Sequence, residues 1–497
     1  MQTLTIIGGG IAGLSAGIYG RLNGFDTTIY EMSSKAGGVC SSWYREGYSV
    51  NGSVHWVVGS APGTDLYDMW HQLGVIENQA YYNHNIFVAY RNINGQEVNF
   101  YLDLHRLREH FNEIAPEDAA ATNEFIEAIE ATGNNHFPLD RSFELLNAWD
   151  WAKIVAGNIP FFLNMSKYGG VSVSEFANKF QSPVIRKALK SSWFSPMAMT
   201  FFLMQYAYAK KGAAGYPLGG SGAFVEKLLQ RYEHLGGKIH YNIRVESIRI
   251  EAGKAVGIET ASGAQVPSDY IIAACDGHTV IHKMLDKAYV DQGTLDAYNK
   301  LQTFPALVYF SAGVNREFPE ALPAIVGINI PLPTPLAVGT CKHDRVTFQL
   351  YTFDPTLAPK GKTLITAMVD TDYDSWRTLR EQSEGAYNDE RQRILAALIA
   401  SLEEEFGEIY KYVEFTDLAT PLTYEAWTGN YKGSYEGWLP TPEASKVRMK
   451  THFNELANFY LAGHWTAPGG GMPPAAYSGR NAVQLICKQE QRHFHTH

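Results

Sequence analysis

The chain has 497 residues, more than one hydrophobic core usually holds, so we expect at least two domains. Its formal net charge is −10 and it has no long basic run, which excludes nucleic acid as an expected partner and argues against polybasic binding to anionic lipid. Four scattered cysteines show neither a CxxC motif nor ligand spacing with histidine, so we expect no metal site and a reduced, cytoplasmic protein.

The first thirty residues alternate strand and helix patterns. Leu4 to Ile7 is a short apolar strand that runs directly from the N-terminus, which leaves no room for a signal peptide. After GGGIAG, Leu14, Ile18 and Leu22 recur at the spacing of a buried helix face. Residues 27–30 then read as a second strand. A strand-helix-strand order predicts a parallel sheet.

The glycines between the first strand and helix form GxGxxG. Glu31 follows the last of them by 18 residues, at the end of the second strand. This arrangement is typical of dinucleotide binding, because the glycines allow close approach of a pyrophosphate to a helix N-terminus and the acid accepts hydrogen bonds from a ribose. The expected phosphate-binding residues are Gly8, Gly10, Ile11, Ala12 and Gly13.

Residues 71–213 read as mainly helical and aromatic. Within them, residues 193–209 form the most apolar stretch, which Ser195, Pro196 and Gln205 interrupt, so it is too short and too broken to cross a membrane. Two interpretations stay open for this stretch. It is either one wall of a tunnel for a long apolar substrate, opening at a bilayer surface, or a buried core helix.

A second block of alternating elements begins near Gly219. Residues 223–235 read as a helix, and residues 238–241, 245–251, 255–260 and 269–274 read as strands. Gly219, Gly220 and Gly222 are close together, but no strand pattern precedes them. We therefore expect no second dinucleotide unit and no dedicated NAD(P)H domain.

Beyond residue 300 the pattern is strand-rich. Strands are expected at 306–314, 345–353, 363–369 and 458–462, and a helix at 391–406. The expected fold is α/β: a discontinuous Rossmann-type dinucleotide domain with a parallel sheet, interleaved with an α+β substrate domain. The first takes residues 1–70, 214–300 and 415–497, and the second takes residues 71–213 and 301–414.

Four pieces of the chain resemble the phytoene desaturase, carotenoid isomerase and retinol saturase group of flavoproteins. They are residues 4–59, 215–276, 421–438 and 461–483, in the group's own order. The specific signals are Glu31 followed by Gly37-Gly38, and the glycine-proline segment LAGHWTAPGGGMPP near the C-terminus.

This resemblance implies FAD as the cofactor. It places Lys35 and the backbone of Val245 near the adenosine, and it places residues 461–483, with Gly463 and Met472, beside the flavin and ribityl chain. The group usually has Asp or Glu where this chain has His464. A helix N-terminus at Met472 would stabilise negative charge on the reduced flavin.

The resemblance also implies that residues 47–60 pass close to the flavin ring, so His55 is the candidate acid or base. The alternative is a structural histidine satisfied by backbone hydrogen bonds.

The expected function is an FAD-dependent oxidoreductase that desaturates or saturates carbon–carbon bonds of an apolar polyene or isoprenoid-like molecule. The open alternatives are a non-redox polyene isomerase, an amine or amino-acid oxidase, and a flavin-retaining lipid-binding protein. The electron acceptor or donor is not identified, and peripheral membrane contact stays open.

Overall fold

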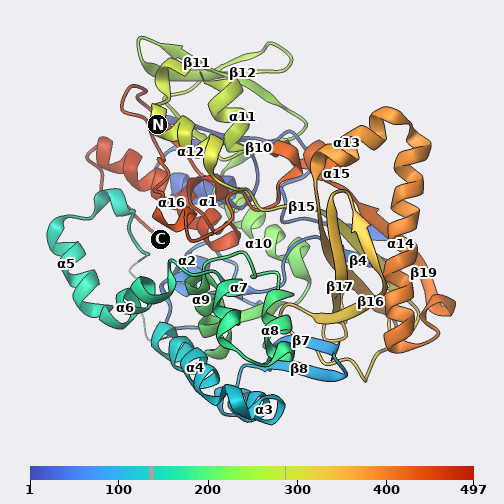
Figure 1. Cartoon of the computed structure of the whole chain (residues 1–497). Coiled ribbons are helices and arrows are strands. Elements are labelled where there is room, and N and C mark those ends of the chain that lie inside the picture. The colour runs from blue at the N-terminus through green and yellow to red at the C-terminus, as the bar shows by residue number, and fades with distance from the viewer. Residues whose placement is uncertain (134–138, 286) are drawn as a thin grey trace.

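A five-stranded parallel sheet forms one layer of the protein (Figure 1). In the computed structural model, which describes residues 1–133, 139–285 and 287–497, its strand order is β10-β2-β1-β14-β20. The strands are β1 (Thr3–Ile7), β2 (Asp26–Tyr30), β10 (Lys238–His240), β14 (Tyr270–Ala273) and β20 (Phe459–Leu461). Every neighbouring pair is parallel. The predicted parallel sheet is therefore confirmed, and it joins strands from three distant parts of the sequence.

Three helices pack beside this sheet. They are α1 (Ile11–Leu22), α10 (Gly220–His234) and α16 (Met472–Gln489), and α1 contacts both of the others. Gly24, with a φ of +77°, follows the end of α1 and supplies the left-handed conformation at which the helix stops. A separate antiparallel ribbon projects from the same part of the molecule (Figure 1, top). It consists of β11 (Val245–Glu251), β12 (Lys254–Thr260) and β13 (Gln265–Pro267).

A seven-stranded sheet forms the other large layer, with order β19-β15-β18-β17-β16-β7-β8. Its pairs are antiparallel except for β16 with β7, which are parallel. The strands are β7 (Ile86–Ile93), β8 (Gln96–Tyr101), β15 (Ala306–Val314), β16 (Ile328–Val338), β17 (Cys341–Leu350), β18 (Thr363–Thr371) and β19 (Val413–Ala419). Helices α13 (Tyr373–Gln382) and α14 (Glu384–Phe406) lie along its outer side (Figure 1, right), and α14 packs on β16.

Strands β7 and β8 correct the prediction that residues 71–213 are mainly helical. Residues 86–90 are buried without interruption, so they lack the apolar-polar alternation by which a half-exposed strand is recognised. The Asn94-Gly95 pair between the two strands, with φ of +52° and +81°, is a hairpin signal that could have revealed them.

A second correction concerns Gly219. The strand β9 (Ala214–Pro217) does precede it, pairing with the short strands β5 (Val57–Val58) and β6 (Tyr81–Tyr82). This is nevertheless not a second dinucleotide unit. Two amides at the start of α10 are already occupied by side chains, because Gly219 N donates to Asp354 Oδ2 at 2.9 Å and Ser221 N donates to Asn51 Oδ1 at 3.0 Å.

The remaining elements surround these layers. A hairpin joins β3 (Ser42–Arg45) to β4 (Tyr48–Asn51). The other helices are α2 (Asp65–Gln72), α3 (Leu104–Ile114), α4 (Ala119–Gly133), α5 (Ala148–Gly157), α6 (Ile159–Tyr168), α7 (Val173–Phe176), α8 (Pro183–Lys190), α9 (Met199–Lys210), α11 (Gly277–Thr279), α12 (Gln292–Lys300) and α15 (Pro421–Thr428). Across the described ranges, no helix has both the length and the apolar character needed to span a bilayer. The division into two interleaved domains remains a prediction, and residues 134–138 within it lie outside the described part of the chain.

Candidate functional site

In the glycine motif after β1, two glycines are required by close backbone contacts, and the third has free space beside it. A side chain at Gly8, where φ is +100°, would place its Cβ 2.6 Å from the Ala274 carbonyl oxygen, and one at Gly13 would lie 1.9 Å from the Gly8 oxygen. At Gly10 the nearest atom would be the Gly37 oxygen, 3.9 Å away. Gly8 and Gly13 therefore allow the tight turn and the helix packing, whereas Gly10 leaves open space for a ligand.

Glu31 is held beside this turn by the protein backbone. Its Oε2 accepts a hydrogen bond of 2.6 Å from Gly9 N, and its Oε1 accepts one of 2.7 Å from Ser33 N. Each carboxylate oxygen keeps lone pairs for a further donor. The side chain is thus fixed in a position to receive ribose hydroxyls, the role predicted for it.

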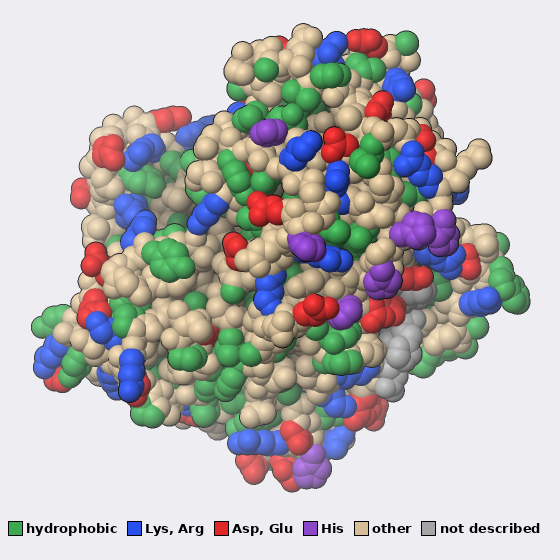
Figure 2. Space-filling model, turned by 180° about the vertical axis from the view of Figure 1, so that it is seen from behind, with side chains coloured by type: hydrophobic (Ala, Val, Ile, Leu, Met, Phe, Trp, Pro, Cys, Tyr) green, Lys and Arg blue, Asp and Glu red, His purple; other side chains and the backbone are tan. Residues whose placement is uncertain are grey.

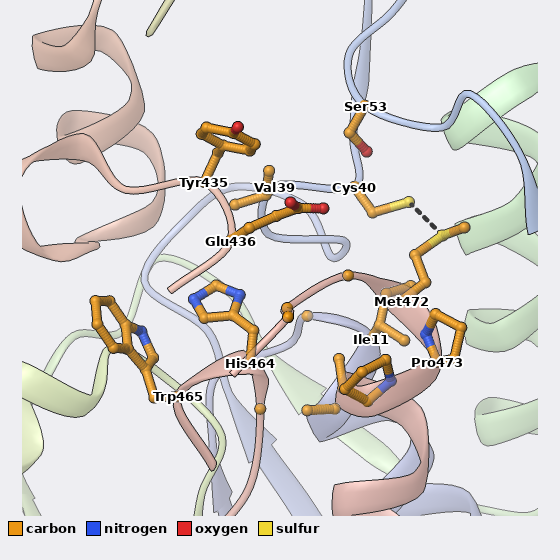
Figure 3. A pocket seen from close by; sticks show the side chains of 18 of the residues that line it. Ile11, Val39, Cys40, Ser53, Tyr435, Glu436, His464, Trp465, Met472 and Pro473 are labelled. Atoms are coloured by element: carbon orange, nitrogen blue, oxygen red, sulfur yellow. Dashed lines mark hydrogen bonds between the residues drawn. The ribbon is translucent and has the colours of Figure 1, made fainter. Parts of the chain in front are cut away.

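Two helix N-termini open onto the same cavity. No side chain caps α1 at Gly10 or α16 at Gly471. The two helices pack closely, because a Cβ at Gly479 would lie 2.3 Å from the Ala12 oxygen. Figure 3 shows Ile11 of α1 near Met472 and Pro473 of α16. Uncapped N–H groups with the partial positive charge of a helix N-terminus favour phosphate and other anionic groups.

Most of the predicted cofactor residues border this cavity. Gly37 lies against the first glycine turn, since its N donates to the Gly9 oxygen at 2.9 Å. The predicted residues in the lining are Gly8, Gly10, Ile11, Ala12, Glu31, Gly37, Gly38, His55, Val245, Gly463, His464 and Met472. Lys35 is not in the lining; its ammonium donates to the Ser42 carbonyl oxygen and lies over the Trp427 ring. Its predicted place near the adenosine remains a prediction.

The cavity has a volume of about 760 Å³ and continues beyond the dinucleotide site. Its lining also includes Leu307, Thr366 and Met368 of the seven-stranded sheet, and Phe161 and Met165 of α6. The cofactor region and an apolar chamber are therefore parts of one continuous space.

Helix α9 has a core face and a cavity face, so the core interpretation of the apolar stretch is confirmed for one face, and the substrate tunnel remains a prediction for the other. Phe202, Leu203 and Tyr206 are buried in the core, where Phe202 stacks on Phe125 with ring centroids 6.0 Å apart. Phe201 and Met204 instead line the cavity. A Cβ at Gly469 would lie 3.0 Å from the Phe201 ring, so this wall borders the C-terminal glycine loop.

His55 and His464 are enclosed histidines at the cavity. Neither ring nitrogen of His55 has a hydrogen-bond partner among the described residues, and the same is true of His464 Nε2. The alternative in which backbone hydrogen bonds satisfy His55 is therefore wrong. Burial lowers the pKa of each ring to about 4, so both imidazoles are neutral at pH 7.

Glu436 is a cavity residue that the sequence reasoning missed. Its Oε2 is buried and has no hydrogen-bond partner among the described residues. Burial raises the pKa of this carboxyl to about 8. The signal in the sequence was an acid between two aromatic residues, Tyr435 and Trp438, inside the segment 421–438 that carries part of the family resemblance.

The residues present fit FAD. Gly10 leaves space for a pyrophosphate, Glu31 is positioned for a ribose, and two uncapped helix N-termini face the same cavity. The same cavity is also lined by apolar side chains of α9 and of the seven-stranded sheet, among them Phe201, Leu307 and Met368.

Comparisons with known proteins agree with this assignment. The family model of the flavin containing amine oxidoreductases matches residues 11–487. A 4,4'-diapophytoene desaturase of Methylomonas sp. is 23% identical over 99% of this chain and 96% of its own length. A chloroplastic prolycopene isomerase of Daucus carota is 23% identical over 54% of this chain and 43% of its own.

A solved structure of putrescine oxidase has a TM-score of 0.61 at 13% identity, covering 98% of this chain and 99% of its own, which shows a common fold. The family match spans nearly the whole sequence, beginning at Ile11 within the first glycine motif, and it includes the C-terminal glycine segment of the site. The chain belongs to the flavin containing amine oxidoreductase family and is an FAD-dependent oxidoreductase.

Proposed function

We propose that the protein desaturates carbon–carbon bonds of an apolar polyene or isoprenoid-like molecule. The observation that carries this proposal is the continuous cavity that joins the cofactor region to an apolar chamber. The wall contributed by α9 and the seven-stranded sheet includes Phe201, Met204, Leu307 and Met368, and its described residues include no Asp, Glu, Lys or Arg. Such a wall suits a hydrocarbon and offers no counter-ion to an ammonium group.

The relatives support the same substrate class. The Methylomonas relative is named for desaturation of 4,4'-diapophytoene, and it aligns over nearly all of this chain. The prolycopene isomerase covers only about half of it, so isomerisation is the alternative that the test must separate.

In the proposed reaction FAD, when bound, accepts the two electrons that desaturation releases. The chain holds and orients the reactants. The glycine turn and Glu31 would hold the pyrophosphate and ribose of FAD, and Val245 would border the adenine. Gly463, His464 and Met472 would border the flavin. His55, with a neutral ring at the cavity, remains a candidate acid or base.

Anaerobic mixing with substrate is the direct test. When FAD-loaded protein is mixed with 4,4'-diapophytoene or phytoene without oxygen, we expect the yellow flavin absorbance to bleach in proportion to product formed, because each new double bond delivers two electrons. Stopped-flow absorbance at the flavin band, combined with chromatography of the polyene, measures both quantities.

The same mixture distinguishes the alternatives. Conversion of many substrate equivalents with an unchanged flavin spectrum would establish an isomerase. Hydrogen peroxide formed with putrescine in air would establish an amine oxidase. Tight polyene binding with neither conversion nor bleaching would establish a carrier.

We also propose that the substrate enters from a membrane surface at α5 and α6. These helices expose Trp149 and Leu163, whose accessible fractions are 68% and 65%, and also Ile159. Phe161 and Met165, which also belong to α6, line the cavity. Figure 2 shows hydrophobic side chains on the projecting edge that these helices form, at the right. An exposed apolar surface that continues into the substrate cavity suits the transfer of a lipid-soluble molecule.

Vesicle binding tests this surface. We expect the native protein to sediment with phosphatidylcholine vesicles, and the double variant Trp149→Asp and Leu163→Asp to bind about tenfold or more weakly, because two charges then face the acyl region. Tyr410→Asp is the matched control, since Tyr410 is 66% exposed and lies outside α5 and α6. Equal vesicle binding by the double variant and native protein, at equal FAD content, would remove the proposed surface.

A further inference from the structure

Glu436 is fixed in space by the C-terminal glycine loop. A Cβ at Gly470 would lie 2.3 Å from the Glu436 carbonyl oxygen, so the loop packs directly on its backbone. A Cβ at Gly471 would lie 3.7 Å from Glu436 Oε1. Gly471 immediately precedes Met472, the first residue of α16. The carboxyl therefore lies at the open helix N-terminus that borders the cofactor region.

The segment on both sides of Glu436 is also held firmly. Gly469 N donates to the Trp438 oxygen at 3.0 Å, and Phe304 N donates to the Gly437 oxygen at 2.9 Å. Figure 3 shows the Glu436 side chain extending into the pocket between Tyr435 and His464. The backbone from which the carboxyl extends is therefore anchored at the cavity wall.

No charged group of the described residues compensates this carboxyl. Its Oε2 has no hydrogen-bond partner, and burial alone accounts for the change in its pKa, which rises to about 8. A carboxyl with this proton affinity holds a proton at pH 7 and loses it just above, which suits a group that exchanges protons near neutral pH.

We propose that Glu436 is the catalytic residue that takes a proton from the substrate during desaturation. Desaturation removes one hydrogen with its bonding pair as hydride, which passes to the oxidised flavin. The adjacent carbon loses its hydrogen as a proton to Glu436 Oε1, and the pair left behind forms the double bond. The two electrons then leave to an acceptor of the dioxygen or quinone class, and Glu436 releases its proton to water. This assignment rests on the proposed function.

The other titratable side chains around Glu436 keep one charge state through this range. His464 is neutral, because burial lowers its pKa to about 4. Tyr435 on the same segment, Tyr424 on α15 and Cys40 across the cavity are neutral as well, since burial raises the pKa of each. His55 is neutral as well, because burial lowers its pKa to about 4. A titration near pH 8 is thus assigned to Glu436.

The pH dependence of flavin reduction tests the proposal. With 4,4'-diapophytoene under anaerobic conditions, the rate in native protein should rise about tenfold between pH 7 and pH 9, because the reactive form is the carboxylate. In Glu436→Gln the rate should fall by about a hundredfold and become independent of pH over this range, with FAD fully bound. Glu443→Gln, an exposed acid on the same segment, should behave as native protein.

A second measurement requires no substrate. The absorbance spectrum of the bound flavin in native protein should change with an inflection near pH 8, because a charge appears beside it, and Glu436→Gln should abolish the inflection. Glu436→Asp keeps a carboxyl and should keep the inflection, which preserves the test if the glutamine variant does not fold. If native protein fails to react with polyenes, the proposed function fails, and this titration still tests the carboxyl.

Three results would overturn the proposal. The first is that FAD-loaded Glu436→Gln keeps the native rate and pH profile. The second is that the spectral inflection persists in this variant. The third is that the variant folds but has lost FAD, which would assign Glu436 to cofactor binding.

Discussion

Replacing Gly10 with valine is expected to abolish FAD binding and leave the protein folded. The backbone of Gly10, with φ −73° and ψ −175°, is extended and suits a branched residue. Leaving aside the adjoining residues of the chain, the nearest atom to the position of a Cβ there is the Gly37 oxygen, at 3.9 Å. The valine side chain therefore occupies only the space assigned to the pyrophosphate. We expect FAD affinity to fall at least about a hundredfold, or roughly 2.7 kcal/mol.

Bound flavin per chain, measured by absorbance after reconstitution, and the circular dichroism spectrum test this result. Gly170→Val is the matched control, because Gly170 is exposed and a Cβ there meets no atom within 4 Å. Gly13→Val should instead disrupt folding, since its Cβ would lie 1.9 Å from the Gly8 oxygen. If Gly10→Val binds FAD normally, the pyrophosphate does not lie over this turn.

The second large effect is expected from two adjacent residues of α9. Phe201→Asp places a carboxylate in the cavity, where water can reach it, so the protein should fold and bind FAD. Its affinity for a polyene should fall about tenfold to a hundredfold, because the apolar wall then carries a charge. Phe202→Asp should destabilise the protein by about 4 kcal/mol or more, because Phe202 is 1% exposed and packs among Phe87, Phe125 and Phe194.

Chemical denaturation, flavin content and quenching of tryptophan fluorescence by 4,4'-diapophytoene separate the two variants. The native protein and Phe201→Leu, which keeps an apolar side chain, are the references for ligand affinity. A soluble, FAD-loaded Phe201→Asp with unchanged polyene affinity would show that this face of α9 does not contact the substrate.

The sequence predicted most of the residues that border the cavity at the first glycine turn, because this part of the cavity depends on local geometry. Gly8, Gly10 and Gly13 lie within one turn and one helix start, and Glu31 ends the next strand, so their arrangement follows from neighbouring residues alone. The same holds for β11 and β15, whose observed limits of 245–251 and 306–314 coincide with the predicted ones. Strands β7 and β8 were missed because a strand buried on both faces has no alternating pattern.

The sequence by itself therefore determined the glycine turn with Glu31 and the glycine-proline segment near the C-terminus. Both are short-range features of the backbone. Only the tertiary structure decided that α9 divides into a core face and a cavity face, that no backbone group satisfies His55, and that Glu436 lies at the start of α16. The physical reason is that burial is set by contacts between segments hundreds of residues apart, and it is burial that shifts the pKa values and leaves these polar atoms without partners.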